Sequence, residues 1–150
     1  EFGPGLVMVT GGEPLLQEET PELVAALERA GHRVLVETNG SLDISRVGGI
    51  RVMDLKCPGS GESGSIDWEN IGRLRESDEV KCVIASDEDY DWAVKAVQTY
   101  GLDRRCAVHF SPAWGRYAPA RLAERILEDR PGARLHLQLH KILWPDERGR

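Results

Sequence analysis

Short apolar runs alternate with helix-like segments along nearly the whole chain, and this alternation limits the possible folds more than any other feature. Six runs have the length and apolar, β-branched composition of strands: residues 7–9, 33–37, 51–55, 80–84, 106–110 and 135–139. A repeated strand–helix order is typical of a parallel sheet whose right-handed crossovers place the helices outside it. We therefore expect an α/β fold of mostly parallel strands with outer helices, either an open doubly wound sheet or a partial barrel.

The segments between the strands carry helix start and stop signals. Helices are expected over residues 21–30, 68–75 and 88–100 and from residue 119 to the break at residues 130–132, with a short helix or turn over residues 43–47. Thr20 fits an N-cap, and helical spacing turns Leu23 and Leu127 toward the core. The first strand, over residues 7–9, is expected to be buried on both faces.

Length and charge restrict the class of protein. At 150 residues the chain can build one real hydrophobic core, and we expect residues 1–150 to form a single domain. The formal net charge of −6 argues against a nonspecific nucleic-acid binder and against a binder of acidic membranes, since both need a basic surface. No apolar run approaches the ~20 residues of a membrane-spanning helix. We expect neither nucleic acid nor membrane among the partners.

The three cysteines are widely spaced and odd in number. Cys57, Cys82 and Cys106 do not form a pattern typical of a disulfide framework, and no C-x-x-C pair occurs. Free thiols of this kind are usually small buried packing residues in a reducing compartment. We therefore expect a cytoplasmic protein with structural cysteines.

Polar residues follow the predicted strands at the point where each strand ends. The segments are Thr10-Gly11-Gly12-Glu13, Glu37-Thr38-Asn39, Asp54-Leu55-Lys56, Ser86-Asp87, Ser111-Pro112 and His140-Lys141. The carboxyl ends of parallel strands meet at one rim, where α/β proteins bind their ligands. Gly11 and Gly12 allow positive φ angles and a close approach of backbone to ligand, and the Glu13 carboxylate could accept hydrogen bonds from an ammonium group. The sequence therefore predicts a ligand site at this rim.

Simpler interpretations of the same residues stay open. Residues 10–13 also fit a tight turn with a solvated Glu13, residues 38–40 fit an ordinary turn, and Lys56 fits a solvated charge at a strand end. His109 and His136 alternate with apolar neighbours and are expected to be packed or exposed bystanders. His140 is expected to be either structural or adjacent to substrate. The G-x-G-x-x-G and G-x-x-x-x-G-K-[ST] fingerprints are missing, which disfavours simple dinucleotide and P-loop chemistry.

Several segments carry motifs that match one known enzyme family in order and spacing. The segments are Thr10-Gly11-Gly12-Glu13-Pro14, Glu37-Thr38-Asn39-Gly40-Ser41, Asp54-Leu55-Lys56-Cys57-Pro58-Gly59-Ser60-Gly61, Asp78-Glu79-Val80-Lys81, His109-Phe110-Ser111-Pro112 and Gln138-Leu139-His140-Lys141-Ile142-Leu143-Trp144. The first resembles the G-G-E-P motif of radical S-adenosylmethionine (SAM) enzymes. Together they resemble the 7-carboxy-7-deazaguanine synthase family, and the resemblance covers nearly the whole chain.

The resemblance implies a partial (β/α) barrel of the radical SAM type, with SAM lying across the strand ends. It implies a carbon–nitrogen lyase that cleaves SAM reductively at a 4Fe–4S cluster. The resulting 5′-deoxyadenosyl radical starts the contraction of 6-carboxy-5,6,7,8-tetrahydropterin to 7-carboxy-7-deazaguanine, with loss of ammonia, on the route to queuosine. It also implies Mg²⁺, a homodimer, and an electron donor such as flavodoxin or ferredoxin.

The same resemblance assigns site residues to this chain. The positions that match SAM contacts are Gly12, Glu13, Thr38, Asn39, Asp54, Leu55, Lys56, Ser111, Pro112, Ala113 and Trp114. Glu13 would face the ammonium group of SAM, and residues 111–114 would hold its adenosine end. Thr10 and Pro145 would contact the pterin substrate.

One departure from the family pattern concerns the cluster. The superfamily holds its 4Fe–4S cluster on three closely spaced cysteines upstream of G-G-E-P, and Cys57, Cys82 and Cys106 do not have that spacing. The family's usual Mg²⁺-binding residue follows the cluster loop and is also missing. We expect that an N-terminal strand and the cluster loop precede this segment in a longer protein, and that the segment alone is inactive. The alternatives are another small radical SAM enzyme and a non-catalytic α/β module for ligand binding or dimerisation.

Overall fold

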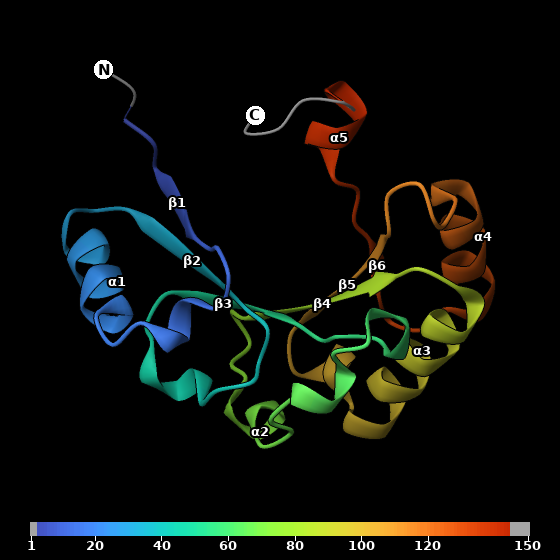
Figure 1. The fold of residues 1–150 in the computed structure, drawn as a ribbon, viewed down its shortest axis with the longest axis horizontal. Coiled ribbons are helices and arrows are strands. Elements are labelled where there is room, and N and C mark those ends of the chain that lie inside the picture. Colours follow the sequence, from blue (N-terminus) through green and yellow to red (C-terminus); the bar gives the residue numbers. More distant parts are fainter. Residues whose placement is uncertain (1–2, 145–150) are drawn as a thin grey trace.

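The computed structural model describes residues 3–144, which form a six-stranded sheet with helices packed against it (Figure 1). The strands are β1 (Leu6–Val9), β2 (Arg33–Thr38), β3 (Ile50–Asp54), β4 (Glu79–Ile84), β5 (Ala107–Pro112) and β6 (Arg134–Leu135). The α-helices are α1 (Thr20–Arg29), α2 (Asn70–Arg73), α3 (Asp87–Tyr100), α4 (Pro119–Asp129) and α5 (Leu139–Leu143). Short 3-10 helices lie at Pro14–Leu16, Ile44–Arg46, Pro58–Ser60, Ser63–Ser65 and Leu102–Arg104.

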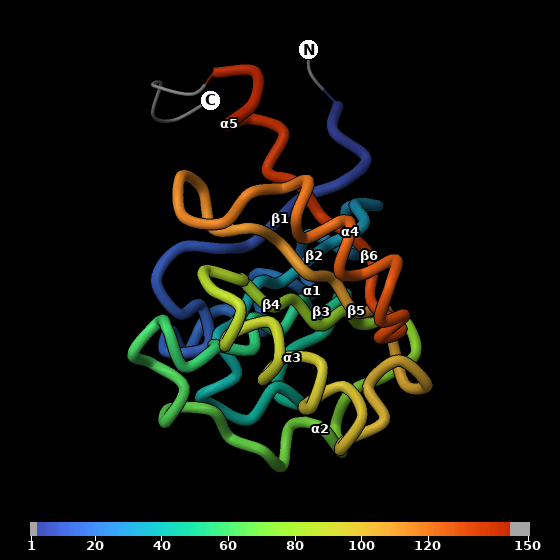
Figure 2. The backbone as a smooth tube through the Cα atoms, turned by 90° about the vertical axis from the view of Figure 1, so that its right-hand side faces the viewer, coloured from blue at the N-terminus to red at the C-terminus, as the bar shows by residue number. Residues whose placement is uncertain are grey.

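The strands lie in the sheet in the order in which they occur in the chain, and every neighbouring pair is parallel. A doubly wound sheet reverses its strand order at a switch point, and this sheet does not. Each right-handed crossover therefore places its helix on the same face. Figure 2, turned by 90°, shows α2 and α3 on one side of the sheet and α5 on the other. The fold is the predicted α/β architecture in its partial-barrel form.

Alternation along β2, β4 and β5 separates a buried apolar outer face from a less buried inner face. In β4, Val80, Cys82 and Ile84 are buried, whereas Glu79 and Lys81 turn to the other face and are half-buried. In the hydrophobic core, these outer-face side chains pack against the helices. The largest fully buried side chains include Val24, Val34, Val36, Met53, Tyr90, Phe110 and Leu122. The free thiols of Cys57, Cys82 and Cys106 are all buried, which confirms their prediction as packing residues.

The prediction that the first strand is buried on both faces is wrong. Leu6 and Met8 of β1 are 53% and 51% exposed. Within the described residues β1 is an edge strand that pairs only with β2. These two side chains lie on the inner face, which no helix of the outer layer covers.

The sixth strand is shorter than predicted. Only Arg134–Leu135 pairs with β5, and residue 139 already begins α5. The last inter-strand bond runs from the His136 N–H to the Phe110 carbonyl, at 2.8 Å. The next bond of a parallel ladder would need an N–H at Pro112, which proline lacks, so the pairing ends there.

Three further predictions about helices are corrected. Thr20 lies inside α1 instead of capping it, and its hydroxyl donates to the Pro14 carbonyl at 2.7 Å. Leu23 and Leu127, predicted to face the core, are 50% and 74% exposed. The helix predicted over residues 68–75 contracts to α2, a single turn. Among residues 3–144 no helix is both long and apolar enough to cross a membrane.

Candidate functional site

The turn after β1 exposes its backbone at the carboxyl rim of the sheet. Gly11 and Gly12 have φ angles of +107° and +55°, which side chains with a Cβ rarely adopt. No heavy atom lies within 4 Å of the position that a Cβ would take at either glycine. The predicted glycine turn is therefore present, and the space above its backbone is open to a ligand.

Glu13 fixes this turn to the end of β2. Its carboxylate is 8% exposed and accepts three hydrogen bonds. Oε1 accepts from the Leu15 N–H at 3.0 Å and from the Thr38 hydroxyl at 2.9 Å, and Oε2 accepts from the Asn39 N–H at 2.6 Å. The alternative of a solvated Glu13 is wrong, because the side chain is a buried link between two rim segments.

A small cavity of about 150 Å³ lies at this rim, and we call it the rim hollow. Its lining residues are Thr10, Gly11, Gly12, Glu37, Thr38, Asn39, Asp54 and Lys56. Six of the predicted ligand-contacting residues thus meet in one place from the ends of three strands. Asp54 Oδ2 pairs with the Lys56 ammonium at 2.7 Å, whereas Asp54 Oδ1 is buried without a hydrogen-bond partner.

A second cavity of about 170 Å³ continues from the rim hollow along the rim. Asp54 and Lys56 line both cavities, and the second adds Cys57, Gly59, Ser60, Val83, Ala85, Asp89, Ala113 and Arg116. Of the four residues predicted to hold adenosine, only Ala113 lines it. The Ser111 hydroxyl is buried without a partner, Pro112 lies buried at the end of β5, and Trp114 is 46% exposed outside both cavities.

One further predicted contact, Leu55, also lines neither cavity, and another falls outside the residues that the structure describes. Leu55 is fully buried in the hydrophobic core, where its side chain packs with the outer-face residues. Pro145, predicted to contact the substrate, lies outside the residues that the structure describes.

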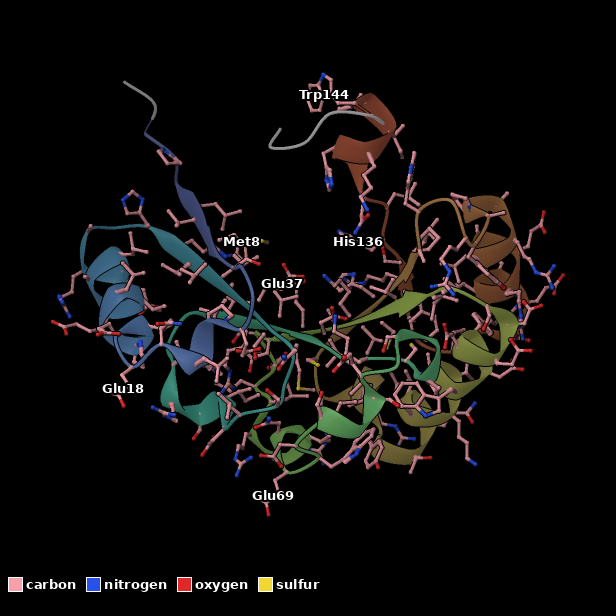
Figure 3. All side chains as sticks on the ribbon, in the orientation of Figure 1. Met8, Glu18, Glu37, Glu69, His136 and Trp144 are labelled. Carbon is pink, nitrogen blue, oxygen red and sulfur yellow. The ribbon has the colours of Figure 1, made fainter. Side chains whose placement is uncertain are left out.

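The concave inner face holds the largest cavity, of about 480 Å³, which we call the inner cavity. Its lining residues are Met8, Leu35, Glu37, Val52, Glu79, Lys81, His109, His136, Leu137, Gln138, Leu139 and His140. Figure 3 shows Met8, Glu37 and His136 around this concave space. Glu37 lines both the inner cavity and the rim hollow, so the two cavities meet at its side chain.

Glu37 is held in a charged network between the two cavities. Its Oε1 forms an ion pair with the Lys81 ammonium, and its Oε2 accepts from the Thr10 hydroxyl at 3.2 Å. Burial raises the pKa of Glu37, but the hydrogen bond and charge of Lys81 outweigh it, so the pKa lies below its ordinary value. Glu37 is therefore an anion at neutral pH.

Several residues that line the inner cavity were not predicted from the sequence pattern. Glu79, Lys81 and Gln138 were not singled out as site residues, and His109 and His136 were expected to be bystanders. The structure places all five in the cavity wall. The signal that could have found them is the alternation of Glu79 and Lys81 with Val80 and Cys82. A strand with one charged face inside an α/β barrel indicates a ligand cavity.

The described residues fit SAM better than they fit a metal cofactor. The open Gly11-Gly12 backbone and the Asp54 carboxylate in the wall of the rim hollow suit a ligand with an ammonium group and hydroxyls. Among residues 3–144, no three His, Cys, Asp or Glu side chains are grouped as a metal site. The buried Cys57, Cys82 and Cys106 therefore do not fit a 4Fe–4S cluster, and this part of the chain offers no grouped ligands for Mg²⁺.

Comparisons with solved structures agree with the fold. QueE from Escherichia coli superposes with a TM-score of 0.70 at 20% sequence identity, over 91% of this chain and 57% of that one. SuiB from Streptococcus suis, solved with S-adenosylmethionine bound, has a TM-score of 0.59 at 15% identity, over 96% of this chain and 42% of that one. At these identities the likeness shows the fold alone.

Comparisons with curated sequences identify the family, although no family model matches the chain. The 7-carboxy-7-deazaguanine synthase of Koribacter versatilis is 41% identical over 161 residues, which cover 95% of this chain and 70% of that protein. The enzyme of the same name from Chlorobaculum tepidum is 40% identical over 154 residues, 99% of this chain and 70% of that protein. On this similarity, the chain belongs to the 7-carboxy-7-deazaguanine synthase family.

Proposed function

We propose that the protein containing this chain catalyses the SAM-dependent conversion of 6-carboxy-5,6,7,8-tetrahydropterin to 7-carboxy-7-deazaguanine, with release of ammonia. One observation carries the proposal beyond family membership. The rim hollow and the inner cavity meet at Glu37. A cofactor at the rim and a pterin on the inner face would therefore lie next to each other, as a reaction between two ligands requires.

SAM would occupy the rim hollow and the cavity beside it. The proposed contacts are Gly12, Glu13, Thr38, Asn39, Asp54, Leu55, Lys56 and residues 111–114. The positive φ of Gly12 favours an approach of the ligand to its backbone. Glu13 already accepts three hydrogen bonds, and a carboxylate offers about four acceptor positions, so at most one position is left for the SAM ammonium. Its main task would be to hold the glycine turn in place. Bound SAM would supply the group that abstracts hydrogen from the substrate.

The pterin would occupy the inner cavity. Thr10 is the proposed contact on the cofactor side, and its hydroxyl is already held by Glu37 at 3.2 Å. Pro145 remains a proposed contact from the C-terminal segment. The volume of about 480 Å³ lies within the 300–1,000 Å³ common for pockets that bind small molecules.

The remaining features of the proposal concern cofactors and partners. We propose a 4Fe–4S cluster and Mg²⁺ as further cofactors, with ligands from outside residues 3–144, and flavodoxin or ferredoxin as the electron donor. A homodimer is the proposed assembly. The cytoplasm is the proposed location, which the three free thiols support because a reducing compartment preserves them.

The test is turnover by the full-length protein, reconstituted anaerobically with iron and sulfide and given SAM, Mg²⁺ and a chemical reductant. Formation of 7-carboxy-7-deazaguanine from the carboxytetrahydropterin, monitored by mass spectrometry, is the expected result. Cleavage of SAM only in the presence of a different substrate would replace the proposal with another radical SAM activity. Binding of SAM without any cleavage would indicate a non-catalytic ligand-binding module.

A further inference from the structure

Three titratable side chains gather on the β4–β5 side of the inner cavity. They are Glu79 at the start of β4, His109 in the middle of β5, and His136 just after β6. The His109 and His136 rings meet edge to face, with their centroids 5.7 Å apart. His109 Nε2 lies 3.2 Å from Glu79 Oε2. None of these residues holds the glycine turn or lines the rim hollow.

The two nitrogens of His109 differ in their surroundings. Nε2 is fully buried and approaches the Glu79 carboxylate, although its alignment falls short of a hydrogen bond. A carboxylate at one imidazole nitrogen fixes the ring orientation and stabilises the protonated form, and such contacts often tighten only when substrate binds. Nδ1 is then the nitrogen through which His109 can act on a ligand in the cavity.

His109 is surrounded by charged groups from both neighbouring strands. Glu79 and Lys81 face it from β4, and Arg134 and His136 face it from β6 and the segment that follows. Burial lowers the pKa of His109, and the negative charge of Glu79 raises it. The positive charges of His136 and Arg134 lower the pKa further, so the net shift is downward. The imidazole is therefore neutral at neutral pH and able to accept a proton.

The proposed reaction needs such a group. Building an aromatic five-membered ring from a tetrahydropterin removes hydrogen from saturated ring carbons, and the departing nitrogen must gain protons to leave as ammonia. In all, the ring carbons lose two hydrogens and the departing nitrogen, an N–H in the substrate, gains two. One is the hydrogen moved in the radical step. In the elimination that follows, the other C–H bond breaks with its electrons kept by the ring as a new carbon–carbon double bond. Its proton must reach the amine whose C–N bond breaks.

We propose, on the basis of the function proposed above, that His109 accepts this ring proton, oriented by Glu79, and then donates it to the leaving amine. The imidazole returns to its neutral form, so the transfer consumes no external acid or base. His136 and His140 also line the cavity, but among the described residues neither forms an ion pair with a carboxylate. His109 is the histidine that combines burial with such a partner.

The experiment compares His109→Gln, His109→Ala and Glu79→Gln in the reconstituted full-length enzyme. Removal of a general acid–base group costs about 10²–10⁴-fold in rate, so kcat of His109→Gln is expected to fall at least about 100-fold while the Kd for the pterin stays within about threefold. Free imidazole is expected to restore part of the activity of His109→Ala, which a merely structural role would not allow.

The pH profile gives an independent readout. Activity of the wild-type enzyme is expected to rise with pH as His109 loses its proton. Glu79 favours the protonated imidazole, so Glu79→Gln is expected to move this acid limb to lower pH. The matched control is His32→Gln, because His32 is bonded to the Pro4 carbonyl at 2.8 Å and does not line the inner cavity, so this variant should change neither kcat nor the profile.

The outcomes separate the two levels of the proposal. An active wild-type enzyme whose His109 variants keep kcat and the acid limb would overturn the role of His109 and leave the proposed function intact. An inactive wild-type enzyme with this pterin would overturn the proposed function and the role of His109 together.

Discussion

At the scale of single residues, Glu13 links the glycine turn to the end of β2, and residues of both segments line the rim hollow. Two backbone N–H groups and one hydroxyl converge on its buried carboxylate from the glycine turn and from the end of β2. A glutamate at a ligand site commonly contacts the ligand through its charged carboxylate. Here the carboxylate already accepts three hydrogen bonds from groups of the protein itself. The geometry of the glycine turn therefore depends on a side chain that is held by hydrogen bonds within the protein.

Glu13→Gln is expected to lower the free energy of unfolding by about 1–3 kcal/mol, because one amide NH₂ would face backbone donors that then lose their acceptor. The affinity for SAM should fall with it. Urea unfolding and equilibrium dialysis with SAM measure the two effects. The matched control is Glu18→Gln, since Glu18 is exposed and points away from the sheet (Figure 3). Equal stability of both variants would contradict a structural role for Glu13.

The ion pair of Glu37 and Lys81 predicts a dependence of stability on pH. The pKa of Glu37 is lowered in the folded state, so its contribution is present above the unfolded value of about 4.3 and is lost as the pH falls through the lower folded value. Lys81→Met removes the largest lowering influence. The variant should be less stable at pH 7 and lose less stability on acidification.

Urea midpoints at about pH 7 and pH 3.5, together with the ¹³C chemical shift of the Glu37 carboxyl, test this expectation. Lys95→Met serves as the control, because Lys95 is exposed on α3. A wild-type and a Lys81→Met protein with parallel pH curves would show that the pair does not set the ionisation of Glu37.

At the scale of elements, the second cavity depends on a link between a loop and a helix. Asp89, in the first turn of α3 and 2% exposed, accepts from the Gly59 N–H at 2.8 Å and from the Ala85 N–H at 3.1 Å. A Cβ at Gly59 would lie 2.6 Å from Asp89 Oδ2. The loop after β3 and the start of α3 can therefore approach this closely only with glycine at position 59.

Gly59→Ala is expected to break this link and to cost about 1–3 kcal/mol in the free energy of unfolding, with weaker binding of SAM. Gly64→Ala is the control in the same loop region, because nothing lies within 4 Å of its Cβ position. Chemical denaturation and dialysis of both variants provide the measurement. Similar losses in the two would mean that the loop tolerates substitution without regard to Asp89.

The sequence predicts where the strands and helices lie better than it predicts how the strands pair and which side chains are exposed. Apolar runs and helix signals locate five of the six strands closely, because those patterns are local. The end of β6 depends on the missing N–H of Pro112 in the neighbouring strand, and the exposure of Met8 depends on β1 being an edge strand. Both facts belong to the pairing between strands, which no local pattern contains.

The candidate site divides in the same way. The rim hollow follows from polar residues directly after strand ends, so Gly12, Thr38 and Lys56 could be predicted to meet. The inner cavity depends on the register that sets Lys81 beside His109, and on segment 136–140 returning to the concave face. These contacts join residues that are far apart in the sequence. From the sequence alone, the residues involved look like ordinary strand residues.

At the scale of the whole molecule, one buried cluster runs from Leu15 to Leu122 through every major element of the outer layer. We expect the described part of the chain to unfold as a single domain, in one transition. Urea curves from far-UV circular dichroism and from tryptophan fluorescence should coincide. Two separated midpoints would show that the sheet contains independent parts.

The sequential order of the strands also has a consequence for synthesis on the ribosome. Each strand from β2 onward pairs on one side with the strand made just before it, so the sheet can grow in the direction of translation. All residues of the rim hollow belong to the first 56 of the chain, whereas the inner cavity is closed by residues 136–140. A nascent chain would therefore assemble the rim hollow early, and the inner cavity would close only after residues 136–140 have been made.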